Sequence, residues 1–282
     1  MMQMLNISRT ISVVYFLCVC VWPGYGQDSA VLSPDMQRII EKKKIVVAMH
    51  CDDGVPFYTL DKSGTLTGLD VDLARDIAKT LGVEVEFNRK AVTFDELVDF
   101  VADRKADMAI SCLSRTRKRA VKVNFSQPYV KLYHTLIINR MKTEKLKAGK
   151  KPSEWLNSSK VSLATVKGSS YVEYVQGDYP EAQLVQYDTF AEAATNVVNG
   201  NMHAVIFDDS EVNEWVRKHP EAVIYVQTQV LKDKEDNIAI ALNWKDTHLL
   251  NWINLYLESY KGNDVLKAIR EASQDDSVKI NE

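Results

Sequence analysis

The chain has 282 residues, 46% of them hydrophobic, and is long enough for two domains that each bury a core. Lys and Arg number 35 against 38 Asp and Glu, which leaves a formal net charge of −3. Because there is no basic excess to neutralise phosphates, the composition argues against a nucleic-acid-binding protein.

The N-terminal residues 1–26 have the composition of a secretion signal. Residues 1–22 carry one positive charge and end in about a dozen apolar side chains before Pro23. Such a run is too short to span a bilayer, which takes about twenty residues. Gly24 and Gly26 place small residues where a signal peptidase reads, so we expect cleavage after Gly26 and a periplasmic protein. An uncleaved N-terminal anchor is the alternative.

The first half of the remaining chain alternates strand and helix patterns, as an α/β sheet requires. Lys42–Met49 ends in the continuous apolar run of a strand that is buried on both faces. A helix begins near Asp70 and Asp72, where acids suit the helix dipole, and ends at Gly82. The next expected elements are a strand at Val83–Phe87, a helix at Phe94–Asp103 and a strand at Asp107–Ser111.

The second half repeats this order. Strands are expected at Val161–Val166, Gln183–Gln186 and Ala204–Phe207, with helices beginning near Tyr171 and spanning Thr189–Val198. After a shift of 96 residues, Thr93–Glu96 aligns with Thr189–Glu192 and Ala109–Ile110 with Val205–Ile206 without a gap. We therefore predict two similar α/β lobes, although amphipathic helices before apolar strands can also resemble one another by chance.

Two α/β lobes direct attention to the carboxyl ends of their strands, where ligands of open sheets bind. Those ends are Met49–Gly54, Ser111–Arg119, Gly168–Ser170 and Asp208–Asp209. Each has a functional and an ordinary interpretation.

In Ser111–Arg119, hydroxyl side chains next to arginine suit a carboxylate ligand, because guanidinium donates paired hydrogen bonds. A solvated basic turn is the alternative. Asp208 and Asp209 can accept hydrogen bonds from an ammonium group; we expect one of them to cap the following helix and the other to face the ligand. The N–H groups of Gly168–Ser170 form either an anion site or an ordinary helix cap.

Several segments resemble the periplasmic amino-acid-binding proteins, bacterial extracellular solute-binding protein family 3. Gly68–Ala74 resembles the family's G-F-D-x-D-L-A segment, Asn124–Tyr129 its D-F-S-x-P-Y segment and Val55–Phe57 its P-P-F loop; Lys105–Ser111 matches a further segment. The resemblance extends from about Lys44 to Ser273. It implies an α/β, type II periplasmic-binding-protein fold, with two lobes of mostly parallel sheets flanked by helices and joined by two hinge crossings.

The resemblance also implies a function and a set of ligand contacts. The protein is expected to capture a small zwitterionic ligand, an amino acid, and to deliver it to a membrane ABC permease. Arg119 matches the arginine that clamps the ligand α-carboxylate, Ser114 its hydroxyl partner, and Asp208 the acid that binds the α-ammonium group. The remaining implied contacts are Ser169, Ser170 and Phe94.

Three residues depart from the family pattern. Gly54 stands where the family usually has an aromatic residue, so we expect the pocket to lose one wall. Cys112 replaces Ser or Gly, and Cys51 stands where an acid is often found. The family's sheet topology brings both cysteines near the ligand as candidate contacts. In an oxidising compartment they can form a disulfide; two free thiols or a soft-metal contact are the alternatives.

Lobe 1 is expected to contain residues 33–133 and 241–282, and lobe 2 residues 134–240. The two crossings are expected near Lys131–Thr135 and Asp236–Ala241. Ligand docks on lobe 1, and lobe 2 then closes over it. We expect a monomer without a cofactor or metal site.

Two other functions were weighed against transport. A cyclohexadienyl dehydratase uses the same scaffold, but that subgroup has Gly-Gly-Thr-Asn-Glu at the turn of the second lobe. Here the turn is Gly168–Tyr171 and no Asn-Glu pair follows, which favours a protein that is not an enzyme. A sensor or partner module that presents ligand to another exported protein is the second alternative.

Overall fold

The computed structural model describes residues 32–262 and 264–267, and within them the chain forms two five-stranded sheets and one two-stranded sheet. The predicted signal peptide lies outside the described residues. We call each five-stranded sheet with its helices a lobe. No helix in the described ranges is long and apolar enough to cross a membrane.

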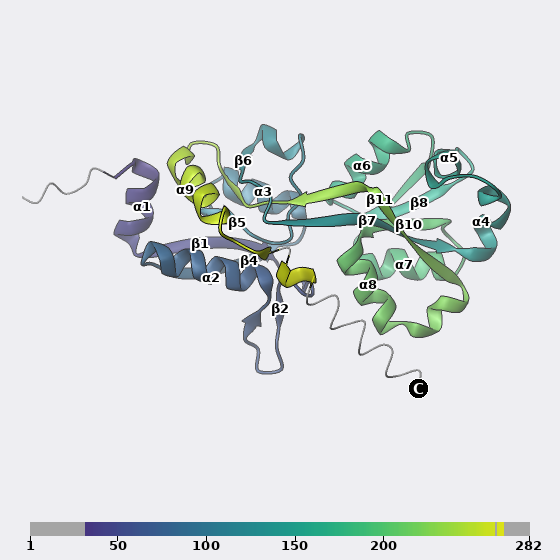
Figure 1. The fold of residues 1–282 in the computed structure, drawn as a ribbon, viewed down its shortest axis with the longest axis horizontal. Helices are drawn as coiled ribbons and strands as arrows, with labels where there is room; N and C mark the ends of the chain where they lie inside the picture. Colours follow the sequence, from purple (N-terminus) through teal and green to yellow (C-terminus); the bar gives the residue numbers. More distant parts are fainter. Residues whose placement is uncertain (1–31, 263, 268–282) are drawn as a thin grey trace, which may run out of the picture. The chain divides into compact units, whose positions relative to one another are not determined.

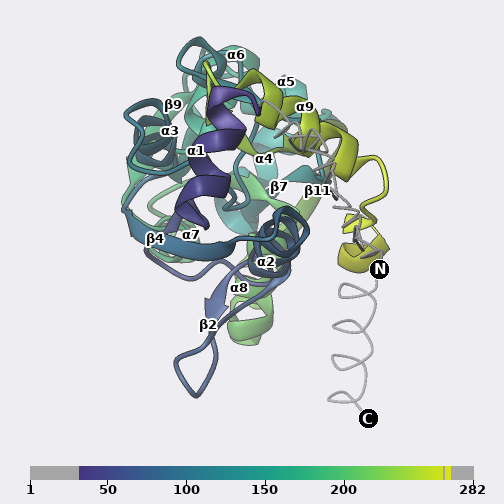
Figure 2. The ribbon, with the colours of Figure 1, turned by 90° about the vertical axis from the view of Figure 1, so that its left-hand side faces the viewer.

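The first lobe has the strand order β4-β1-β5-β12-β6. β1 pairs in parallel with β4 and β5, whereas β12 runs antiparallel to β5 and β6. Its strands are β1 (Lys44–His50), β4 (Glu84–Ala91), β5 (Met108–Ala109), β6 (Val123–Phe125) and β12 (Ala241–Asn243). Its helices are α1 (Pro34–Lys42), α2 (Leu69–Leu81), α3 (Phe94–Ala102) and α9 (Thr247–Leu257). β2 (Thr59–Leu60) and β3 (Leu66–Thr67) form a hairpin that projects near α2 in Figures 1 and 2.

The second lobe has the strand order β11-β7-β10-β8-β9. Its strands are β7 (Val130–Asn139), β8 (Ser162–Val166), β9 (Gln183–Tyr187), β10 (Ala204–Asp208) and β11 (Val226–Ile238). Its helices are α4 (Arg140–Lys147), α5 (Pro152–Leu156), α6 (Ser170–Asp178), α7 (Phe190–Val198) and α8 (Asp209–Lys218). Here β8 pairs in parallel with β9 and β10, and β7 runs antiparallel to β10 and β11.

The two sheets share one topology, as the sequence repeat predicts. β4, β1 and β5 of the first lobe correspond to β9, β8 and β10 of the second, and each set continues into two antiparallel strands. The helices α3 and α7 begin in the same way, because Thr93 and Thr189 accept hydrogen bonds from the N–H groups of Glu96 and Glu192, both at 3.2 Å. Such a cap stabilises a helix by about 1 kcal/mol.

Two long strands connect the lobes at the positions predicted for the crossings. β7 and β11 pair antiparallel from Val130 and Ile238 at one end to Asn139 and Val226 at the other (Figure 1). An isolated bridge between Ser114 and Ile238 ties this ladder to the first lobe. Because the strands are hydrogen-bonded to each other, a hinge motion has to bend both together.

Each lobe buries a core of its own. Ile45, Met108 and Ile240 belong to the core of the first lobe, and Leu163 and Ile206 to that of the second, all with 0–1% exposure. This is what the chain length predicts for a protein of two domains.

The strand predicted at Asp107–Ser111 is shorter in the structure. Only Met108 and Ala109 form ladder pairs with β1. The Asp107 carboxylate accepts the N–H of Val46 at 2.8 Å and so replaces a ladder bond at the start of the strand. At the other end the backbone leaves the sheet, and Cys112 adopts a left-handed conformation with φ 47°.

Candidate functional site

The guanidinium of Arg119 is buried, and all three of its nitrogens have acceptors within the protein. Nε donates to Asp95 Oδ1 at 3.0 Å, Nη1 to the Ser114 carbonyl at 3.1 Å and Nη2 to the Gly168 carbonyl at 3.2 Å. Asp95 and Ser114 belong to the first lobe and Gly168 to the second. Arg119 therefore joins the two lobes, and the Asp95 carboxylate occupies a donor expected for a ligand carboxylate.

Ser114 and Ser170 meet directly across the two lobes, with their hydroxyl oxygens 2.8 Å apart. Ser114 donates its single hydroxyl proton to Asp236 Oδ2 at 2.7 Å, so Ser170 is the donor to Ser114. Asp236 also accepts from the hydroxyl groups of Tyr174 at 3.0 Å and Tyr171 at 3.5 Å. Burial raises the pKa of Asp236, although these hydroxyl groups and nearby Arg119 favour its charged form.

Asp208 lies at the end of β10 and caps α8. Its Oδ1 accepts the N–H of Glu211 at 2.9 Å, and the residue is only 7% exposed. Asp209 Oδ1 accepts the N–H of Tyr133 on β7 at 3.1 Å. The sequence predicts that one acid caps the helix and the other faces the ligand. In the structure the helix cap is Asp208, the same residue that the family resemblance assigns to the ligand ammonium group. Its second oxygen has no hydrogen-bond partner among the described residues.

Gly168 contacts the first lobe through its backbone. Besides the Arg119 bond, its carbonyl accepts the N–H of Asp95 at 3.1 Å. Its φ is +69°, and a Cβ at this position would lie 2.8 Å from the Thr93 Cβ, closer than two side chains can pack. Only glycine suits this position, because it combines a left-handed backbone with contact to the other lobe.

The other two predicted contacts lie in the same region. Ser169 is the N-cap residue of α6, but its hydroxyl donates to the Val166 carbonyl of its own lobe at 2.6 Å. Phe94 packs against the cores of both lobes, and its ring lies 5.1 Å from that of His50. The structure thus brings Arg119, Ser114, Ser170, Asp208 and Phe94 to the facing sides of the lobes, whereas the Ser169 hydroxyl turns inward.

The space expected to be open at Gly54 is filled by Tyr58. A Cβ at Gly54 would lie 2.8 Å from Cζ and 2.9 Å from the hydroxyl oxygen of Tyr58. Tyr58 is 3% exposed, so its ring belongs to the interior of the first lobe. The expectation of a missing wall is therefore wrong, because an aromatic ring four residues later occupies the position.

Cys51 and Cys112 are free thiols in the structure, so the disulfide considered from the sequence does not form there. Burial raises the pKa of the Cys112 thiol well above its usual range, and the nearby Asp208, Asp70 and Asp236 carboxylates raise it further. Burial also raises the pKa of Cys51. Both side chains are therefore neutral thiols at pH 7.

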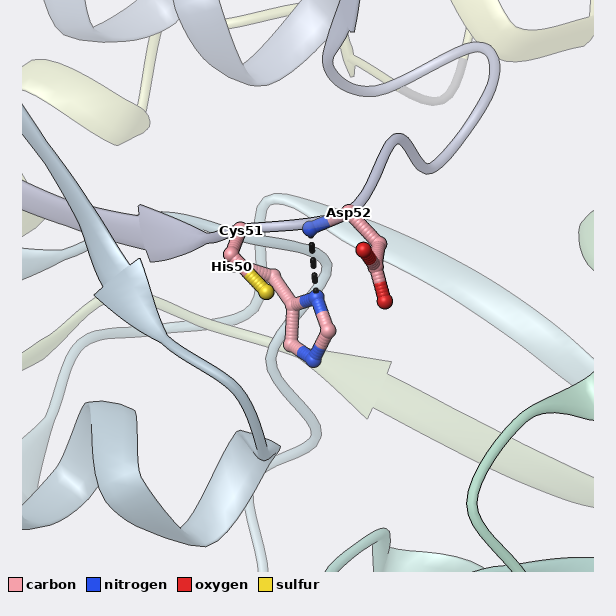
Figure 3. Close-up of side chains that lie close together, drawn as sticks. All are labelled: His50, Cys51 and Asp52. Carbon is pink, nitrogen blue, oxygen red and sulfur yellow. Dashed lines mark hydrogen bonds between the residues drawn. The ribbon is translucent and has the colours of Figure 1, made fainter.

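Cys51 lies in a group of possible metal ligands with His50 and Asp52, whose ligand atoms are within 4.8 Å of one another (Figure 3). The N–H of Asp52 donates to His50 Nδ1 at 3.1 Å, as the dashed line in Figure 3 shows. His50 Nε2 then carries the proton and donates to the Val92 carbonyl at 3.0 Å. Because both ring nitrogens are engaged, the soft-metal alternative finds no prepared imidazole ligand here.

Glu211, on the first turn of α8, was not singled out from the sequence. Burial raises its pKa to about 7, and the Glu214 carboxylate adds to this while Lys218 opposes it. Its carboxylate also interacts electrostatically with Tyr58 and Cys112 of the first lobe. Glu211 therefore belongs to the facing sides of the lobes together with Asp208.

The raised pKa of Glu211 predicts a pH-dependent stability. A folded-state pKa above the unfolded value means that the folded protein binds more protons between pH 4.5 and about 7. The Glu211 contribution to the free energy of unfolding therefore falls as pH rises through this window. Glu211→Gln should be nearly neutral at pH 5 and should stabilise the ligand-free protein by up to about 3 kcal/mol at pH 8. Urea unfolding at both pH values measures this difference.

Glu214→Gln is the matched control for that measurement. Hydrogen bonds from Arg217 lower the pKa of Glu214 below its usual value, and burial, which acts in the opposite direction, does not cancel this effect. The Glu214 carboxylate therefore stays charged from pH 5 to 8. Its replacement should change stability by a similar amount at the two pH values, with a much smaller difference than Glu211→Gln shows, because Glu214 is only a minor contributor to the raised pKa of Glu211. An equal effect of Glu211→Gln at pH 5 and pH 8 would contradict the raised pKa.

Comparison with known proteins decides the family. The sequence profile of the bacterial extracellular solute-binding proteins, family 3, matches residues 45–272. The chain belongs to this family. Among curated relatives, this solute-binding protein is 27% identical over 219 residues to ABC transporter arginine-binding protein 1 of Escherichia coli, covering 77% of this chain and 85% of that protein.

Solved structures agree with this assignment. A putative ABC transporter binding component from Wolinella succinogenes in complex with lysine has a TM-score of 0.65 and 28% identity over 77% of this chain and 89% of its own. The arginine-bound form of a truncated arginine-binding protein from T. maritima has a TM-score of 0.64 and 28% identity, and the match covers 80% of this chain and 100% of that one. An ancestral amino-acid-binding protein, a precursor of cyclohexadienyl dehydratase, has a TM-score of 0.66 and 27% identity, and the match covers 84% of this chain and 98% of that one. The solute-binding protein therefore has the two-lobed fold of periplasmic amino-acid-binding proteins.

Sequence reasoning missed four residues of this solute-binding protein's candidate site. They are Asp95, Tyr174, Glu211 and Asp236. The first two lie within amphipathic helices, where a polar side chain is usually solvent-exposed. Asp236 lies inside the second predicted crossing. The presence of an acid within that hinge segment was the one signal that could have identified it.

Proposed function

We propose that the protein binds a free amino acid between its lobes and delivers it to an ABC permease in the membrane. The observation that carries the proposal is the meeting of the expected ligand groups of both lobes. Arg119 and Ser114 of the first lobe contact Gly168 and Ser170 of the second, and Asp208, a largely buried residue, has one carboxylate oxygen without a partner among the described residues. The names of the relatives, which include arginine- and glutamine-binding proteins, point to the same ligand class.

In this proposal the α-carboxylate of the ligand takes the place of Asp95 on Arg119. Asp95 is the acceptor best able to leave, because 36% of its side chain is exposed and Lys118 pairs with it at 3.2 Å. The α-ammonium group of the ligand then binds Asp208, and a cation there favours the charged carboxylate, whose pKa burial raises well above its usual range. Ser170 and the turn before α6 complete the contact from the second lobe.

The finer features of the function rest on the sequence. Export by a signal peptide cleaved after Gly26, a monomeric state and lobe limits of 33–133 with 241–282 and 134–240 are parts of the proposal. So is the absence of catalysis, since Gly168–Tyr171 lacks the Asn-Glu pair of the dehydratase turn. The hinge is the β7–β11 ladder, which carries Asp236 next to the ligand groups.

A thermal-unfolding screen tests the proposed function. Protein purified from the periplasm of an expression host is unfolded, dialysed and refolded to remove carried-over ligand, then heated with each common amino acid. A true ligand at about a hundred times its Kd should add about 2.7 kcal/mol to the free energy of unfolding, which raises Tm by several degrees. No shift with any amino acid would overturn the proposal, with keto acids and polyamines as controls for other ligand classes.

A further inference from the structure

The first turn of α8 places two acids with free oxygens on the side of the second lobe that faces the first. The N–H of Glu211 donates to Asp208 Oδ1 at 2.9 Å, which makes Glu211 the third residue after the helix cap. At this position a Glu side chain often returns to the N–H of the capping residue. No such return bond forms in α8, and the Glu211 carboxylate has no hydrogen bond or ion pair among the described residues.

The surroundings of these two acids are short of positive charge. Besides burial, the negative charges of Asp208 and Glu211 both raise the pKa of the Cys112 thiol, and that of Glu211 also raises the pKa of the Tyr58 hydroxyl. Arg119 is already shared by Asp95 and two carbonyls. Burial raises the pKa of Glu211 and Lys218 lowers it through its charge, but the Lys218 ammonium group forms an ion pair with Glu214 at 3.1 Å.

The neighbouring acids differ from this pair because their oxygens are engaged. Asp236 accepts from Ser114 and two tyrosines, and Asp70 accepts from the Tyr129 hydroxyl at 2.8 Å and the Cys112 N–H at 2.5 Å. Asp208, by contrast, is 7% exposed and keeps one oxygen without a partner. A carboxylate oxygen without a donor on a residue this little exposed is poorly solvated, so the arrangement is suited to cations brought by a ligand.

The first lobe does not supply an acid of its own at the corresponding place. Cys51 stands there as a neutral thiol, and Asp53, two residues on, is paired with Arg89 at 3.0 Å. Asp52, which lies between them, is exposed to solvent and therefore competes less well than the more buried acids of α8 for a second cationic group of a bound amino acid.

We propose that Glu211 binds a cationic side-chain group of the ligand, a guanidinium or a primary ammonium, while Asp208 binds the α-ammonium group. This inference rests on the proposed function and narrows it to basic amino acids. Tyr58, which fills the space above Gly54, is a residue of the first lobe whose hydroxyl the Glu211 charge influences. The two acids lie three residues apart on one helix turn, so the ligand presents both of its cations to a single element.

Pairs of ligands that differ in charge but little in shape test the proposal. Arginine and citrulline form one such pair, and lysine and norleucine the other. Isothermal titration of the refolded periplasmic protein should show arginine binding at least a hundredfold more tightly than citrulline. Glu211→Gln should reduce that ratio at least tenfold while citrulline affinity changes less than threefold, which also shows that the variant is folded. Glu214→Gln, one helical turn away, should leave the ratio unchanged.

Other outcomes separate the inference from the function on which it rests. If neutral or acidic amino acids bind and the basic ones do not, the protein is an amino-acid-binding protein but the Glu211 assignment is wrong. An arginine-to-citrulline ratio that survives Glu211→Gln intact also overturns the assignment. If no amino acid binds to the wild-type protein, both proposals fall together.

Discussion

Arg119→Ala should lower the affinity for the amino-acid ligand by about a hundredfold or more. Removing one partner of a buried, hydrogen-bonded charge pair costs about 2–5 kcal/mol, and Arg119 donates to acceptors from both lobes. The variant loses the clamp for the ligand carboxylate and also the bond from Nη2 to Gly168. Isothermal titration with the ligand found in the thermal screen measures the effect.

Arg117→Ala is the control for this variant, because Arg117 lies two residues earlier in the same segment and is exposed. Its affinity should stay within about twofold of the wild type, since exposed charges contribute little. Unfolding of both variants in urea shows whether each is folded before binding is compared. An Arg119→Ala protein that is folded and binds within a few-fold of the wild type would contradict the carboxylate assignment.

Gly168→Ala should hinder closure of the lobes and weaken ligand binding about tenfold or more. The substitution adds a Cβ that would lie 2.8 Å from the Thr93 Cβ of the first lobe, and relieving such an overlap costs about 1–3 kcal/mol. The closed form bears this cost and a form with separated lobes does not, so the population shifts away from closure. Small-angle X-ray scattering should show a larger radius of gyration for the variant with ligand than for the wild type with ligand.

Gly200→Ala isolates the contact from the backbone strain. Gly200 has φ +76° against +69° for Gly168, and a Cβ there would approach no atom closer than 3.9 Å. Both variants should lose a similar free energy of unfolding, on the order of 1 kcal/mol, from the left-handed backbone. Only Gly168→Ala should lose affinity, and adding Thr93→Gly should restore much of it. Equal affinity in the two alanine variants would sink the role of this contact.

The architecture was largely readable from the sequence because local patterns determine it. The strand and helix order depends on patterns of residues within one or two turns of each other. Hydrophobic periodicity and helix-end signals act over such short spans, so helices and strands can be predicted from them without knowledge of the tertiary structure. The limits of the strands were less predictable, and β5 is shorter than expected because the Asp107 side chain replaces one of its ladder bonds.

Part of the candidate site could also be predicted. Arg119, Ser114, Ser170 and Asp208 lie at strand ends, where the topology of α/β sheets directs attention. The family motifs singled out the same four residues, and the structure places them on the facing sides of the lobes.

Only the tertiary structure decided which atoms these residues contact. Arg119 reaches Asp95 across 24 residues and Gly168 across 49, and Ser114 meets Asp236 across 122. Tyr58 fills the space at Gly54 because the loop after β1 folds back on itself, which composition cannot reveal. A hydrogen bond requires its atoms within about 3 Å, and over such separations that distance follows from the packing of two lobes rather than from any local preference of the chain.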